Sequence, residues 1–123
     1  MANKIKIAIP TDDGLMVNQQ FKGSRGFIVA TILEGKIVHQ ELRWNLLSEI
    51  LTSEHGSFYN LDDCDVVIVN EIGPRQRELL QVIKKKIVQT NQTEIPKALL
   101  DYVATNLNIV KAKQVAKESL IHI

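Results

Sequence analysis

The chain has a single cysteine, Cys64, among its 123 residues. It therefore cannot form an internal disulfide, and it cannot supply the four thiolates that an all-cysteine iron-sulfur site usually takes. A small buried thiol is the ordinary role of a cysteine that precedes an apolar strand, so we expect Cys64 to be structural. Any metal cluster would need other ligands.

The sequence also lacks an excess of one charge and lacks long apolar runs. Fifteen basic and fourteen acidic residues leave a net charge of +1, which argues against nucleic-acid binding. No apolar run approaches the roughly 18 residues that cross a bilayer. The first residues, MANKIKIAIP, lack the features of a signal peptide. We therefore expect one compact cytoplasmic domain without membrane contact.

Strand patterns occur at several places. The segment KIKIAI, residues 4–9, alternates apolar and polar residues, and we expect Pro10 to end this strand. Residues 27–33 and 36–43 predict an antiparallel hairpin whose two-residue turn is Glu34-Gly35. The run DVVIV, residues 65–69, predicts a parallel strand covered on both faces, and we expect it to be central. Residues 86–90 predict another short strand.

Helix patterns alternate with these strands. Pro74 suits the first position of a helix that runs to Lys84. Thr93 is a candidate cap for a second helix, whose apolar face would be Ile95, Leu99, Leu100 and Val103. Residues 45–63 are best described as helical, and the tail, residues 106–123, is compatible with a surface helix. The order predicts an α/β fold with a mixed sheet.

Two local patterns suggest function. In TDDG, residues 11–14, the Asp-Gly pair predicts a turn, although its carboxylates could instead form a site. Arg75 and Arg77 follow Gly73-Pro74, where the positive end of a helix dipole disfavours cations by about 0.3 to 1 kcal/mol. A bound anion would explain these arginines, and so would simple pairing with Glu71 or Glu78. Both explanations stay open.

Three segments taken together, IAIPTDDG, QFKGSRGF and DVVIVNEIGP, make the chain resemble the dinitrogenase iron-molybdenum cofactor-binding domain family. The resemblance runs from about Ile5 to about Tyr102, so we assign residues 1–105 to the domain and 106–123 to a tail. It implies a ribonuclease H-like fold with a sheet of about five strands. Members include carriers of the nitrogenase cofactor or its precursors and small proteins of unknown role.

The family's second motif usually reads His-Phe-Gly-Arg, whereas this chain has Gln20 followed by Phe21. Glutamine lacks the imidazole nitrogen that binds transition metals, so a ligand role does not carry over to Gln20. The third motif usually has two glycines where this chain has Asn70 and Glu71. The metal ligands therefore remain unassigned.

The loops after the first and the DVVIV strands should meet at the carboxyl ends of the sheet, where open α/β folds leave a crevice for ligands. We expect this crevice to bind a ligand through side chains, charges and close backbone contacts. The candidate residues are Asp12, Asp13, Phe21, Lys22, Gly23, Arg25, Asn70, Glu71, Ile72, Gly73, Arg75 and Arg77.

These observations predict a non-catalytic binding or carrier protein that holds an anionic metal-sulfur cluster, such as an iron-molybdenum cluster, or an oxyanion. One alternative is a magnesium-dependent phosphoryl-transfer enzyme that uses Asp12, Asp13 and Glu71. Another is a protein-interaction module that docks a partner through the hairpin edge or the tail.

Overall fold

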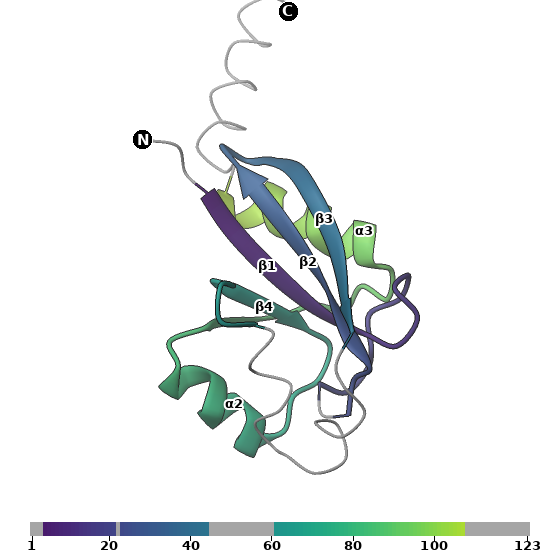
Figure 1. Cartoon of the computed structure of the whole chain (residues 1–123), viewed down its shortest axis with the longest axis vertical. Coiled ribbons are helices and arrows are strands. Elements are labelled where there is room, and N and C mark those ends of the chain that lie inside the picture. Colours follow the sequence, from purple (N-terminus) through teal and green to yellow (C-terminus); the bar gives the residue numbers. More distant parts are fainter. Residues whose placement is uncertain (1–3, 22, 45–60, 108–123) are drawn as a thin grey trace, which may run out of the picture.

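The computed structural model describes residues 4–21, 23–44 and 61–107 (Figure 1). These residues form a mixed five-stranded sheet with two α-helices, which confirms the predicted α/β class. The helix predicted within residues 45–63 lies almost wholly outside the described residues, as does most of the tail. In the described part of the chain, no helix is long and apolar enough to cross a membrane.

The sheet has the strand order β3-β2-β1-β4-β5. Pairing is antiparallel between β1 and β2 and between β2 and β3, and parallel between β1 and β4 and between β4 and β5. The strand bounds are Lys4–Thr11 for β1, Gly26–Leu33 for β2, Lys36–Trp44 for β3, Val66–Val69 for β4 and Lys86–Gln89 for β5. The prediction that the DVVIV strand is central was wrong, because β1 is the middle strand; β4 is interior and buried on both faces.

Strand β1 does not end at Pro10. Pro10 pairs with Phe27, and Thr11 pairs with Gly26. Proline removes only an N–H donor, and β4 pairs with β1 only at Ile7 and Ala8. One side of β1 is therefore free of ladder bonds at Pro10, and a proline there breaks none.

The predicted hairpin is confirmed. Its turn residues Glu34 and Gly35 have φ of 52° and 80°. A type I′ turn requires positive φ at both central positions, and its twist matches that of the flanking strands. The turn fixes the register of β2 and β3, with an irregularity between Thr31 and Ile32.

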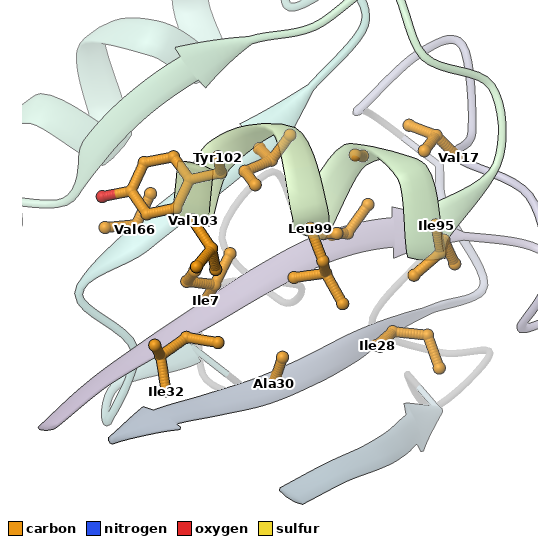
Figure 2. Packing of buried hydrophobic residues seen from close by; sticks show 13 residues of the cluster. Ile7, Val17, Ile28, Ala30, Ile32, Val66, Ile95, Leu99, Tyr102 and Val103 are labelled. Atoms are coloured by element: carbon orange, nitrogen blue, oxygen red, sulfur yellow. The ribbon is translucent and has the colours of Figure 1, made fainter. Parts of the chain in front are cut away.

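The two helices cover opposite faces of the sheet. Helix α3, Ile95–Tyr102, continues into one π-helical turn, η2, Val103–Leu107. Figure 2 shows its apolar side chains above β1 and β2. The N-cap is Glu94 rather than the predicted Thr93, and Leu100 is 61% exposed. The predicted capping and the buried role of Leu100 were therefore wrong.

Helix α2, Pro74–Val82, packs on the other face through Leu80. It begins at Pro74 as predicted but ends before Lys84, whose φ of 62° lies outside the helical region. Because α2 follows β4 directly, the loop between them places the first turn of α2 at the carboxyl end of the sheet. That position determines the candidate site.

Candidate functional site

The loops after β1 and β4 meet at the carboxyl ends of these strands, as predicted. Gln20 and Glu71 form an isolated parallel bridge, and the Glu71 N–H donates to the Gln19 carbonyl over 3.1 Å. A pocket of about 330 Å³ lies beside this junction. We call it the Gln76 pocket; its lining residues are Gln20, Phe21, Glu71, Ile72, Gly73 and Gln76.

Gln76 is the most unusual residue of the pocket. Its side chain is buried, with 7% of the residue exposed, and no hydrogen bond to its amide occurs among the described residues. Among the described residues, every fully buried side-chain nitrogen or oxygen has a hydrogen-bond partner. The Gln76 amide is therefore open to the pocket, where it can bond to a ligand or to water.

Gly73 makes room for this amide. A Cβ atom on Gly73 would lie 2.8 Å from Gln76 Oε1, which is closer than real Cβ contacts. The φ of Gly73 is −70°, which any residue can adopt. Glycine is needed here for space and not for its backbone conformation.

The pocket lies at the N-terminus of α2. Gly73 is the N-cap and gives no side-chain capping bond, and the first turn contains no acidic residue. Free N–H groups and the helix dipole make such an end favourable for anions. Arg75 is exposed and Arg77 is half-buried in this region, although neither lines the pocket.

Asp12 and Asp13 have structural roles instead of lining the pocket. Asp13 Oδ1 accepts from the N–H groups of Leu15 and Met16 over 2.8 and 2.9 Å. These bonds hold the pKa of Asp13 below its usual value. Asp12 Oδ1 accepts from the N–H of Arg25 over 2.9 Å. The turn interpretation is confirmed, and neither carboxylate is part of the Gln76 pocket.

Other predicted residues also lie away from the pocket. The Asn70 amide donates to the carbonyls of Thr90 and Gln92 over 2.8 and 2.9 Å, so it is directed toward the loop after β5. Gly23 is exposed, with φ of +80°, and Arg25 is exposed. Lys22 lies outside the described residues. The predicted residues that the structure brings together are Phe21, Glu71, Ile72 and Gly73.

Sequence reasoning left two lining residues out of the site, Gln20 and Gln76. Gln20 could have been chosen as a site residue from the sequence, because it occupies the position of the family histidine. Nothing in the sequence pointed to Gln76 as a site residue, because a glutamine in the first turn of a helix is normally exposed. Gln76 is nevertheless buried, and it lines the pocket together with Gln20 and Phe21 from the loop after β1.

The donor atoms of the pocket do not fit a cluster ligated by the protein. Thiolate and imidazole are the ligands that such metals prefer, and the described residues that line the pocket offer neither. Among the described residues, no group of three or more His, Cys, Asp or Glu side chains could hold a metal ion. Cys64 precedes β4, at the end opposite the pocket, and burial raises its pKa to about 12. A ligand held by hydrogen bonds fits better.

A second pocket, of about 460 Å³, lies between β5 and α3. The side-chain amide of Gln92 already donates to Asp101 Oδ2 over 2.7 Å, and the main-chain carbonyl of Gln92 accepts from the Asn70 side chain. Its polar groups are thus partly paired within the protein. The Gln76 amide has no hydrogen-bond partner among the described residues, which makes the Gln76 pocket the better candidate.

The described residues thus form a small α/β domain with a pocket of ligand size at the carboxyl ends of its strands. Residues 3–105 match the family model described as dinitrogenase iron-molybdenum cofactor, and the chain belongs to this family. No curated protein matches the sequence.

Solved structures share the fold. The crystal structure of PH0822 has a TM-score of 0.71 and 22% identity, covering 84% of this chain and 92% of that one. The apo form of the orange protein from Desulfovibrio gigas has a TM-score of 0.61 and 21% identity, covering 80% of this chain and 86% of that one. At these identities the likeness concerns the fold alone.

Proposed function

We propose that the protein is a non-catalytic binding domain that holds a compact anion by hydrogen bonds in the Gln76 pocket. The ligand class is an oxyanion or thioanion, such as molybdate or its sulfur analogue. The observation that carries this proposal is the amide of the largely buried Gln76, which is accessible from the pocket and has no hydrogen-bond partner among the described residues. Because the amide is accessible from the pocket, a bound anion can take the place of water as the acceptor of its N–H bonds.

The surroundings favour negative charge. The amide N–H groups at the start of α2 lack a side-chain cap, and an anion can accept from them. Arg75 and Arg77 add positive charge on the same turn. Their position at the positive end of a helix dipole, unfavourable in isolation, is compensated when an anion is bound.

Glu71 opposes this charge, because its side chain is acidic and lines the pocket. Two arginines on the first turn outweigh one carboxylate, so the net local charge stays positive. The carboxylate should nevertheless limit the affinity for highly charged ligands. Family membership supports a role in binding or carrying, and the donor set favours hydrogen bonding over ligation to metal.

The magnesium-dependent alternative has less support. Asp12 and Asp13 accept hydrogen bonds from backbone amides of their own loop, and Glu71 is the one carboxylate among the described residues that line the pocket. A two-metal site would need several carboxylates directed at one point.

A titration of the full chain followed by backbone and side-chain amide NMR tests the proposal. Anaerobic tetrathiomolybdate and molybdate are added in separate series, with magnesium chloride as a third. We expect the anions to shift the amide signals of Ile72 and Gly73 and the side-chain NH₂ of Gln76. No anion-dependent shift at these groups would refute the proposal, and magnesium shifts at Asp12 and Glu71 would favour the enzyme.

The matched variants are Gln76→Leu and Gln81→Leu, which lie on the same helix, one buried at the pocket and one exposed. Loss of a hydrogen bond to a charged ligand costs about 1.5–3 kcal/mol, so Gln76→Leu should weaken anion binding by about 10- to 100-fold. Gln81→Leu should bind as the parent does. Equal affinities for both variants would remove Gln76 from the site.

A further inference from the structure

Glu71 brings a carboxylate to a pocket whose other polar side chains are amides. The described residues that line the Gln76 pocket include two glutamines, Gln20 and Gln76, and one acid, Glu71. An amide offers N–H donors and a carbonyl acceptor, whereas an ionised carboxylate accepts hydrogen bonds and donates none. The pocket therefore combines groups that can donate to an anion with one group that needs a donor from its ligand.

The Glu71 carboxylate is not used within the described part of the chain. The main-chain N–H of Glu71 donates to the Gln19 carbonyl over 3.1 Å, and the residue pairs with Gln20 in the isolated bridge. These contacts involve the backbone alone. No ion pair or side-chain hydrogen bond among the described residues includes the Glu71 carboxylate. The backbone thus holds Glu71 at the pocket, and its side chain is available to a ligand.

The acids of the loop after β1 differ from Glu71 in this respect. Asp13 accepts from the N–H groups of Leu15 and Met16, and Asp12 accepts from the N–H of Arg25. Those carboxylates stabilise their own loop. Glu71 makes no such bond, and a carboxylate beside an anion site repels every ligand that lacks a proton to share. A ligand that donates an O–H to the carboxylate removes this disadvantage.

Oxyanions differ in whether they keep a proton near neutral pH. Molybdate, sulfate and the dianion of a phosphomonoester have no O–H, so an ionised carboxylate can only repel them. Inorganic phosphate and arsenate keep at least one O–H. Such an ion can donate to a carboxylate through one oxygen and accept from amides through the others, and a charge-assisted O–H···O⁻ bond is short and strong.

We propose that Glu71 makes the Gln76 pocket selective for a protonated oxyanion of the hydrogen phosphate type over oxyanions that carry no proton. This inference rests on the proposed function, because it requires that the pocket hold a compact anion. Glu71 accepts from the O–H of the ligand, while the Gln76 amide and the N–H groups at the start of α2 donate to its other oxygens. The carboxylate that weakens molybdate binding is then the group that determines specificity.

Hydrogen phosphate and fluorophosphate are matched probes, because both are mainly tetrahedral dianions at pH 8 and only the first has an O–H. Each is titrated into the full chain, Glu71→Gln and the exposed control Glu78→Gln, and the NMR signals of the Gln76 side-chain NH₂ and the Gly73 amide are followed. One hydrogen bond to a charged group corresponds to about 10- to 100-fold in affinity. We expect the parent and Glu78→Gln to prefer hydrogen phosphate by at least about tenfold. Glu71→Gln should lose this preference.

The ratio of the two affinities separates a specificity role from a structural one, because a distorted pocket weakens both ligands alike. Equal affinities in the parent overturn the selectivity, and so does an unchanged ratio in Glu71→Gln, while binding itself upholds the proposed function. If neither probe nor molybdate shifts these signals in the parent, the proposed function fails and the selectivity fails with it. Glu71→Leu is the second variant, and it should lose the preference as well. Amide spectra of β1 and β4 show whether each variant keeps the folded core.

Discussion

Gln76 Oε1 occupies the space that a Cβ atom on Gly73 would need, at a distance of 2.8 Å. Glycine at the N-cap of α2 thus lets a glutamine side chain fold back over the loop and present its amide to the pocket. We therefore expect substitutions at Gly73 and Gln76 to be coupled in their effect on binding.

Gly73→Ala should displace the Gln76 amide and weaken anion binding. The displaced atom is the end of a flexible side chain and the φ of Gly73 suits alanine, so stability should change by less than about 1 kcal/mol. Binding and urea unfolding are measured for Gly73→Ala, Gln76→Ala and the double variant. Gly73→Ala should have little effect on binding once Gln76 is alanine. Additive losses would contradict the coupling.

Glu71→Gln should raise affinity for the anion, because a carboxylate that lines the pocket is replaced by a neutral group of similar size. A charge in partly exposed surroundings contributes about 1 kcal/mol, which corresponds to roughly a fivefold tighter complex. Isothermal titration with molybdate measures the effect. Glu78→Gln, an exposed position farther along α2, is the control. Weaker binding by Glu71→Gln would show that the carboxylate contacts a ligand donor.

Asp63 should make stability depend on pH in the acid range. Arg43 donates to it over 2.6 Å and Lys6 over 2.9 Å, and these partners hold the pKa of Asp63 well below its usual value. A lowered folded-state pKa gives stability that is present above about pH 4 and is lost as the pH falls through the folded pKa.

Asp63→Asn should therefore lower the free energy of unfolding at pH 7 by about 1 kcal/mol, a modest value because the carboxylate is partly solvent-screened. The difference from the parent should shrink toward pH 2. Urea unfolding at both pH values tests this, with the exposed Asp62→Asn as control. A difference that stays constant across this range would rule out the ion-pair explanation.

Cys64 should resist thiol reagents in the folded protein. It is 1% exposed, and burial raises its pKa to about 12, so little thiolate is present at pH 8. A disulfide reagent should label it slowly in buffer and within the mixing time in urea. Rapid labelling of the native protein would show that the segment around Cys64 opens readily.

The local elements could be predicted because short-range chemistry determines them. Glu34 and Gly35 form the expected turn, since few residue pairs adopt positive φ twice. The β-branched run from Val66 to Val69 forms a strand buried on both faces, as its composition indicates. The expectation that the loops after β1 and β4 meet at the carboxyl ends of the sheet was likewise confirmed, because it depends only on strand direction.

Other expectations failed because they depend on neighbours far along the chain. Pro10 stays in a strand because β4 pairs with β1 only at Ile7 and Ala8, so that no ladder bond needs an N–H at Pro10, which the segment around Pro10 cannot show. Asn70 follows a strand that points at the crevice, but the carbonyls of Thr90 and Gln92 attract its amide.

The sequence by itself determined the α/β class, the hairpin, the helix start at Pro74 and the family, because each depends on residues close in the chain or on a short motif. The tertiary structure alone decided which polar groups face the pocket. Backbone amides engage Asp12 and Asp13, whereas Gln76 is buried beside the Gln20 loop, in the pocket that both residues line. A polar side chain becomes a binding group only when its surroundings bury it and leave its hydrogen bonds unmade, and distant segments of the chain provide those surroundings.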